Sequence, residues 1–308
     1  MKVLITGGTG FVGRHVLPLL AGNGWEIHAV TSKQKPESDP LGIVWHRLNL
    51  FDACQVDALV EQVKPTHLLH LAWYTETGKF WTSPTNLDWV IGSLSLLSAF
   101  RKHCDGRIVM AGTCAEYDWT YGLCNEGTTP CTPASIYGIA KHNLYNLCSA
   151  FASQAKLSFA CGRIFFLYGP GEPRPRLVPS IICPLLEGKL AQCSHGRQVR
   201  DFLHVQDVAA AFVALLKSEV TGAVNIGSGD PTRIETVVSI LGELLGRPDL
   251  IQFGAIPTSD SEPKMILSDS TRLAREVGWQ PRFNLRDGLQ DTVQWWRQVA
   301  QQTNQFCP

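Results

Sequence analysis

Short apolar runs alternate with amphipathic stretches along the first half of the chain. The apolar runs have the length and β-branched content of buried strands and lie at Val3–Thr6, Trp25–Val30, Ile43–His46, Thr66–Ala72, Arg107–Ala111 and Leu157–Phe166. Helical patterns separate most of them, at residues 14–20, 53–63, 86–103 and 135–153. This alternation predicts an α/β fold with a doubly wound parallel sheet and right-handed crossovers.

The rhythm changes at Tyr168, where the run YGPGEPRP interrupts the alternation. Beyond it, helical patterns dominate, and apolar strands at 198–202 and 223–226 are short. We therefore expect two units. Residues 1–167 form the sheet domain, rejoined by segments near 198–228, and residues 168–308 form a smaller, mostly helical lobe over the carboxyl edge of the sheet.

A glycine-rich turn follows the first predicted strand. The run TGGTGFVG places Gly7, Gly8, Gly10 and Gly13 directly after an apolar strand and before a helix. Glycines at this point let backbone N–H groups and a helix N-terminus approach a phosphate. The spacing, read as G-x-G-x-x-G or as G-x-x-G-x-x-G, predicts a dinucleotide site that includes Phe11 and Val12.

The end of the second strand bears on the choice of dinucleotide. An acidic residue there binds the ribose 2′-OH of NAD(H) in such folds, but this chain has Thr31, Ser32 and Lys33. A lysine attracts a 2′-phosphate, so these residues favour NADP(H), with NAD(H) as second choice. The alternative is that Lys33 only opens the loop that follows.

A tyrosine and a lysine stand four residues apart near the start of the helix at 135–153. Tyr137 and Lys141 lie on one helix face, and the fifth predicted strand ends nearby in the hydroxyl residue Thr113. A phenol has a reference pKa of about 10, and an ammonium one turn away favours the phenolate. This arrangement predicts proton transfer by Tyr137.

Composition narrows the class of protein. The 308 residues are 44% hydrophobic and 18% charged, as in soluble globular proteins, and Lys plus Arg equals Asp plus Glu at 27 each. We expect no nucleic-acid partner and no membrane partner, since no apolar run approaches 20 residues. The first strand leaves no room for a signal peptide, and the ten scattered cysteines show no zinc spacing. We expect a cytoplasmic protein with reduced thiols and no metal.

With these motifs and the later run GRQVRDFLHVQDVA, the chain resembles the extended short-chain dehydrogenase/reductases, most closely their nucleotide-sugar epimerases, dehydratases and reductases. The resemblance implies a Rossmann domain for NAD(P), a lobe for a nucleotide-diphosphate sugar and a homodimer joined through the helices at 86–103 and 135–153. Thr113, Tyr137 and Lys141 match the catalytic Ser/Thr–Tyr–Lys triad.

The resemblance also assigns binding residues. Leu71, Ala72 and Trp73 match the strand end beside the cofactor, Asn49 and Leu50 match the adenine contacts, and Arg200 matches the arginine that pairs with the substrate diphosphate. Thr75 lies at the mouth of the expected site. Glu116 either faces the sugar or is a surface carboxylate, and the aromatic loop at 73–84 either covers a ligand or packs on the surface.

Departures from the family pattern reduce the number of reactions that the chain is expected to catalyse. The 4,6-dehydratases carry acidic residues directly after the triad hydroxyl, where this chain has Cys114 and Ala115. The fucose-synthase type has a cysteine at the position of Ala115. Phe166 and Trp89 replace family asparagines and make the site less polar. We therefore expect an NADPH-dependent reductase of a 4-keto nucleotide sugar. The alternatives are an NAD-dependent C4 epimerase and, more remotely, a non-catalytic cofactor-binding sensor.

Overall fold

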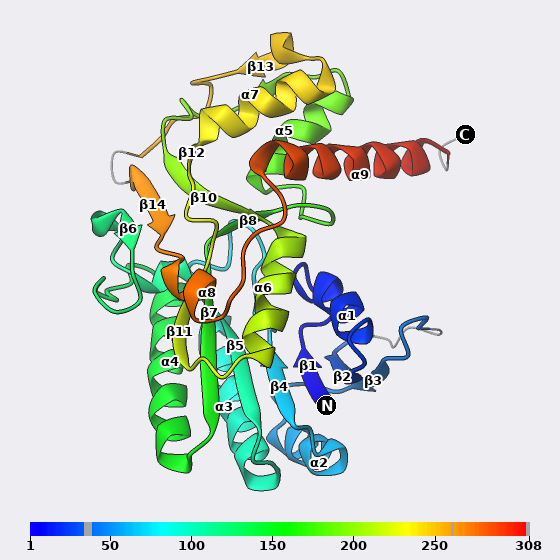
Figure 1. The fold of residues 1–308 in the computed structure, drawn as a ribbon. Helices are drawn as coiled ribbons and strands as arrows, with labels where there is room; N and C mark the ends of the chain where they lie inside the picture. Colours follow the sequence, from blue (N-terminus) through cyan, green and yellow to red (C-terminus); the bar gives the residue numbers. More distant parts are fainter. Residues whose placement is uncertain (34–38, 260–261, 306–308) are drawn as a thin grey trace.

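The computed structural model describes residues 1–33, 39–259 and 262–305 (Figure 1). Its main sheet has seven parallel strands in the order β11-β7-β5-β4-β1-β2-β3. The strands are β1 (Lys2–Thr6), β2 (Glu26–Thr31), β3 (Val44–Arg47), β4 (His67–His70), β5 (Arg107–Thr113), β7 (Ser158–Ile164) and β11 (Gly222–Ile226). The predicted doubly wound parallel sheet is confirmed.

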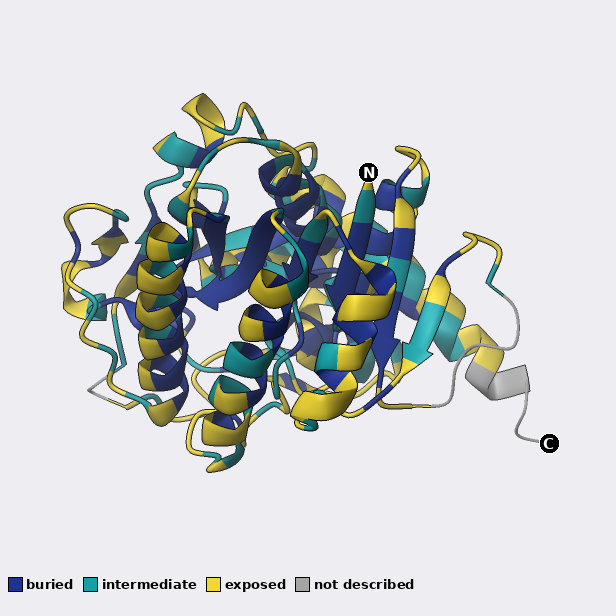
Figure 2. Cartoon of the chain, turned by 90° about the horizontal axis from the view of Figure 1, so that it is seen from below, coloured by how far each residue is buried: buried dark blue, intermediate teal, exposed yellow. Residues whose placement is uncertain are grey.

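Helices cover both faces of this sheet. On one face lie α2 (Ala53–Val63), α3 (Thr85–His103) and α4 (Ile136–Ala155), and on the other lie α1 (Gly13–Ala21) and α6 (Val205–Lys217). Seen from below, the central strands are mostly buried, the edge strand β3 is intermediate to exposed, and the helices expose mainly their outer sides (Figure 2). Strands covered on both faces read as continuous apolar runs, which explains why their positions were predictable.

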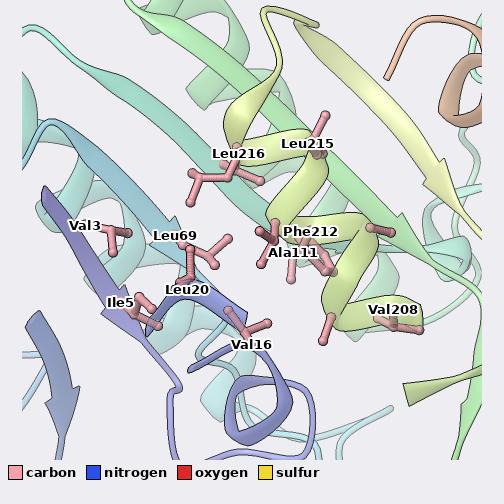
Figure 3. Packing of buried hydrophobic residues seen from close by; sticks show 14 of the residues in the cluster. Val3, Ile5, Val16, Leu20, Leu69, Ala111, Val208, Phe212, Leu215 and Leu216 are labelled. Carbon is pink, nitrogen blue, oxygen red and sulfur yellow. The ribbon is translucent and has the colours of Figure 1, made fainter. Parts of the chain in front are cut away.

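The core beside the glycine turn joins distant parts of the chain. Val16 and Leu20 of α1 pack beside Phe212 and Leu216 of α6, over strand residues such as Ile5 (Figure 3). Helix α6 and strand β11 therefore return the chain to the main sheet after it has left at β7. This packing holds the N-terminal turn against elements that lie 200 residues further along the chain.

The second lobe combines helices with a small sheet. Helices α5 (Leu177–Leu186), α7 (Ile234–Leu245) and α9 (Leu285–Gln305) pack around one core, and α8 (Thr271–Arg275) is short. The small sheet contains β6 (Leu123–Cys124), β8 (Phe166–Tyr168), β10 (Val199–His204), β12 (Pro231–Arg233) and β14 (Met265–Ser268), while β9 (Ala191–Gln192) pairs with β13 (Ile251–Gln252).

One predicted strand divides between the two sheets. The run at Leu157–Phe166 was expected as a single strand, but β7 ends at Ile164 and β8 pairs instead with β10 of the small sheet. The expected run is continuous because both parts are apolar. Only the tertiary pairing shows that the chain leaves the main sheet there. Among the described residues, no helix is long and apolar enough to cross a membrane.

Candidate active site

A cavity of about 550 Å³ opens between the carboxyl ends of the main-sheet strands and the second lobe. Ligands in such folds bind at these strand ends. Most of the residues selected from the sequence line it. They are Gly7, Gly10, Phe11, Val12, Gly13, Leu71, Ala72, Trp73, Thr75, Thr113, Tyr137, Lys141 and Arg200.

The glycine turn forms one end of the cavity and has no room for side chains. Gly7 has a φ of +74°, and a Cβ there would lie 2.7 Å from the backbone nitrogen of Ala72. A Cβ at Gly13 would collide with the carbonyl oxygen of Gly7, which also accepts a hydrogen bond from the Gly10 N–H at 2.9 Å. Helix α1 begins at Gly13. The bare backbone and the helix N-terminus fit a dinucleotide phosphate.

The three predicted catalytic residues meet in the cavity. Thr113 ends β5, and its side chain is hydrogen-bonded to the phenol of Tyr137 in the first turn of α4. Ser135 caps this helix by accepting from the Gly138 N–H at 3.1 Å. One turn further, the Lys141 Nζ donates to the Ala111 carbonyl at 2.9 Å and lies 3.8 Å from the centroid of a Trp73 ring.

Burial shifts the pKa values of the two titratable triad residues in the directions that favour their neutral forms. It lowers the pKa of Lys141 to about 8, so the amine is still mostly protonated at neutral pH. It raises the pKa of Tyr137 above its ordinary value, against the opposing effects of the Thr113 hydrogen bond and of Arg176. In the ligand-free protein, desolvation of the phenolate is the largest of these effects on the pKa of Tyr137. Tyr137 therefore carries a proton that it can donate.

Glu116 does not face the cavity, so its assignment as a sugar contact is wrong. It is fully buried, and its carboxylate accepts from Arg163 Nε and from the Thr113 N–H, both at 2.9 Å. Both residues of this ion pair are nearly inaccessible to solvent. The glutamate thus holds the turn that carries Thr113. A buried carboxylate requires a paired charge, and Arg163 on β7 could not be located from its spacing in the sequence.

Arg200, the predicted contact of the substrate diphosphate, lines the cavity, but its guanidinium is engaged by the protein itself. Its guanidinium donates to the Val199 and Pro263 carbonyls, pairs with Glu262 at 3.0 Å and lies 5.4 Å from the ring centroid of Phe166. Phe166 lines the cavity as expected. Trp89 does not line the cavity. Its ring centroid lies 6.0 Å from that of Trp73, so it packs against a residue of the cavity lining.

The predicted adenosine contacts lie outside this cavity. Thr31, at the end of β2, is buried and accepts from the Lys33 N–H at 3.1 Å, while Ser32 and Lys33 are exposed. Asn49 is exposed and Leu50 half-buried after the neighbouring strand β3. The first residues of the loop after Lys33 lie outside the described residues.

An aromatic wall, built largely from the loop at 73–84, packs around Tyr137. Phe80 and Trp81 pack edge-on against Tyr137 with ring centroids at 4.8 and 5.5 Å, and Trp119 lies 6.0 Å from Trp81. The loop at 73–84 thus lines the cavity. Of the two expectations for this loop, its position in the cavity lining favours a loop that covers a ligand over one that only packs on the surface.

Asn86, at the start of α3, anchors this wall. Its side-chain oxygen accepts from the Trp73 indole at 2.9 Å, and its nitrogen donates to the carbonyls of Phe80 and Ser83 at 2.8 and 2.9 Å. The residue is fully buried. Asparagine near a helix start is common as a cap, so its sequence position did not distinguish this role.

Several polar residues of the cavity were also missed. Among the described residues that line it, Glu172 and Glu262 are acidic and Arg176 is a further cation beside Lys141 and Arg200. Cys114 lines the cavity as well, but burial raises its pKa, so its sulfur is a neutral thiol. Glu172 lies within the YGPGEPRP run and Arg176 directly follows it. The end of the strand–helix alternation at this run was therefore the sequence feature that could have pointed to them.

Comparisons with known proteins agree with this geometry. A family model described as "NAD dependent epimerase/dehydratase family" matches residues 3–227. CDP-abequose synthase of Salmonella typhimurium is 27% identical and is covered over 97% of its length by 94% of this chain. dTDP-glucose 4,6-dehydratase of an Actinoplanes species is 28% identical and is covered over 98% of its length by 96% of this chain.

Among solved structures, UDP-glucose 4-epimerase of Thermus thermophilus in complex with NAD is similar over 96% of this chain and 99% of that one. It has a TM-score of 0.82 at 26% identity. The family match covers most of the main sheet and all three triad residues. The chain belongs to the NAD-dependent epimerase/dehydratase family, the nucleotide-sugar enzymes of the extended short-chain dehydrogenase/reductases.

Proposed function

We propose that this enzyme reduces the 4-keto group of a nucleotide-diphosphate sugar, with NADPH as the reductant. The observation that carries the proposal is the Thr113–Tyr137–Lys141 triad without a catalytic carboxylate beside it. Cys114 and Ala115 follow Thr113, and the next residue, Glu116, is turned away into its ion pair with Arg163. A 4,6-dehydratase needs a base directly after Thr113 in the sequence to take a proton from C5 of the sugar, whereas reduction of a ketone needs no such base.

The triad then acts as a proton donor. When bound, the nicotinamide supplies a hydride to C4 of the ketosugar. Tyr137 gives its phenolic proton to the ketone oxygen, so the ketone becomes a secondary alcohol and the reduced cofactor becomes oxidised. Thr113, whose side chain is hydrogen-bonded to Tyr137 in the free protein, would donate its hydroxyl to the same ketone oxygen and so orient it. Lys141, mostly protonated at neutral pH, favours the phenolate left behind.

The substrate diphosphate would lie against Arg200, whose guanidinium can form two parallel hydrogen bonds to phosphate oxygens. The adenosine 2′-phosphate of NADPH would lie beside Ser32 and Lys33, which carry two donors and no negative charge. Asn49 and Leu50, after the adjacent strand, would contact the adenine. We assign residues 1–167, rejoined by α6 and β11, to the cofactor, and the other residues of 168–308, among them Arg200 on β10, to the substrate.

A second candidate is an NAD-dependent C4 epimerase, favoured by the similarity to a UDP-glucose 4-epimerase structure that contains NAD. The same triad would serve it, with hydride leaving and returning at C4. An epimerase keeps its cofactor bound, whereas a reductase releases it after each turnover. The two functions therefore differ in whether added NADPH is consumed.

The test follows the absorbance of NADPH, and separately of NADH, during incubation with 4-keto-6-deoxy sugars linked to dTDP, CDP or UDP. Consumption of NADPH in proportion to product supports the reductase. Interconversion of UDP-glucose and UDP-galactose without cofactor consumption overturns it in favour of the epimerase. Cofactor binding without either turnover would support the sensor.

We also propose a homodimer along α3 and α4. These helices expose large apolar side chains on their outer faces, namely Leu87, Ile91, Ile139, Leu147 and Phe151. Exposed apolar patches of this kind mark protein–protein contacts. Sedimentation of the protein and of the Leu147→Asp variant tests this: a wild-type dimer and a dissociated variant are expected, and a monomeric wild type contradicts the proposal.

A further inference from the structure

The segment after β8 contributes Glu172 and Arg176 to the lining of the cavity. Its first residues rest on helix α1, where the Pro170 carbonyl accepts from His15 Nε2 at 2.9 Å and a Cβ at Gly171 would lie 2.9 Å from an Arg14 nitrogen. The Glu172 N–H donates to the Gly169 carbonyl at 3.2 Å. Glu172 is thereby held between the glycine-turn helix and the cavity that it lines.

The Glu172 carboxyl is buried and only partly satisfied. The residue is 5% exposed, and among the described residues its Oε2 has no hydrogen-bond partner. A backbone hydrogen bond from Gly169 reaches the carboxyl. Arg176 is four residues further along the chain, but its guanidinium lies over the Phe80 ring, 5.6 Å from the centroid, and does not form an ion pair with Glu172. A buried oxygen without a partner is costly to the free protein.

Among the described residues, the other three acidic side chains that are buried as a whole are satisfied by the protein itself, whereas the more exposed Glu126 and Asp291 each keep one buried oxygen without a hydrogen-bond partner. Glu116 pairs with Arg163, Asp201 accepts from Ser228, Gly229 and Ser268, and Asp207 accepts from the backbone of Arg282 and Phe283. Each has a structural role that its partners explain. Glu172 differs because its free oxygen belongs to a residue that lines the ligand cavity.

We propose that Glu172 binds ligand directly, presenting Oε2 to an uncharged hydrogen-bonding group. Two sources share this chemistry, the carboxamide of the nicotinamide and a hydroxyl of the sugar. The inference rests on the proposed function only in that the cavity holds a nicotinamide dinucleotide and a nucleotide sugar. It does not depend on which reaction follows.

If Glu172 binds ligand, the affinity for that ligand should depend on pH, because the charge of the carboxyl changes with pH. Burial raises its pKa to about 8, opposed by Arg176 and by the Gly169 N–H. The other charged groups packed near the segment are Arg14 and His15 of α1, and burial lowers the pKa of His15. A ligand that covers the carboxyl removes its remaining solvent and further disfavours the carboxylate. Ligand affinity should therefore fall as pH rises through about 8.

The test measures dissociation constants for wild type, Glu172→Ala and Glu172→Gln. NADPH and NADH are titrated by fluorescence, and dTDP-glucose and UDP-glucose are titrated into cofactor-saturated protein by calorimetry. We expect E172A to lose roughly tenfold in affinity for one class of probe, the size of one lost hydrogen bond. E172Q should retain affinity and lose its decline above pH 8. A loss with NADPH or NADH identifies the carboxamide, and a loss with the sugar nucleotides identifies the hydroxyl.

Glu126→Gln is the matched control. Glu126 also has a buried oxygen without a described partner, but its carboxylate accepts from the Asn225 N–H outside the cavity. Its variant should bind every probe as wild type does, and thermal melting of the ligand-free proteins checks folding.

Two outcomes are contrary to expectation and can be told apart. If wild type binds a dinucleotide but folded E172A and E172Q match it for every probe and pH, the inference is overturned and the proposed function stands. If wild type binds no dinucleotide, the proposed function fails and the inference fails with it.

Discussion

The two ends of the cavity are built in different ways. The glycine turn is a single stretch of seven residues, Gly7 to Gly13, whose shape depends on close backbone contacts at Gly7 and Gly13 that a Cβ would prevent. The other end, which we propose for the sugar, gathers side chains from the loop at 73–84, the turn after β5 and the second lobe, including its strand β8. The first end offers generic backbone donors, and the second end offers specific surfaces. Substitutions at the second end should therefore change sugar recognition with little effect on cofactor binding. Substitutions in the glycine turn should weaken cofactor binding with little effect on sugar recognition.

Tyr137→Phe is expected to have the largest effect on the reaction. Loss of the proton donor should lower kcat by roughly 10²–10⁴-fold, while the Kd for NADPH stays near the wild-type value because the glycine turn is untouched. Rapid-mixing kinetics and fluorescence titration measure the two quantities. An equal loss of cofactor affinity would contradict the separation of the two ends.

Gly13→Ala addresses the other end. The new methyl group would collide with the Gly7 carbonyl, so we expect loss of cofactor binding by on the order of 100-fold, about 2.8 kcal/mol. Gly22→Ala is the control, because Gly22 has a φ of −63° and room for a Cβ at the end of the same helix. Unimpaired binding by G13A would show that the turn is not the phosphate site.

Glu116→Gln tests the corrected role of that residue. Removing one charge of a buried ion pair costs about 3–5 kcal/mol of folding free energy because the other charge is left uncompensated. Urea unfolding measures the loss. If Glu116 contacted the sugar instead, the variant would keep its stability and show a raised KM.

Asn86→Ala should loosen the aromatic wall without touching the glycine turn. It removes three hydrogen bonds that hold Trp73, Phe80 and Ser83. We expect the KM for the sugar to rise about tenfold, and stability to fall by about 1–3 kcal/mol. Asn143→Ala, at an exposed position on α4, controls for the loss of an asparagine. An unchanged KM would mean that the wall does not contact the sugar.

Lys33→Glu should have the smallest effect, since Lys33 is exposed and such pairs contribute about 0–1 kcal/mol. We expect a few-fold loss of affinity for NADPH, little change for NADH, and a difference that shrinks at high salt. Titration of both cofactors measures it. A loss that is equal for both would remove the support for NADPH at this position.

The sequence by itself determined the parallel sheet, the glycine turn and the triad. Each depends on local spacing: Gly7, Gly10 and Gly13 within one turn, Tyr137 and Lys141 on one helix face, and strands that read as apolar runs because both faces are covered. The tertiary structure decided what residues far apart in the chain do. It turned Glu116 toward Arg163, divided the run at 157–166 between two sheets and fixed the aromatic wall through Asn86. It also left Oε2 of Glu172 in the cavity without a hydrogen-bond partner among the described residues. Partners for buried charges and polar groups are chosen by packing across the fold, and no local pattern encodes them.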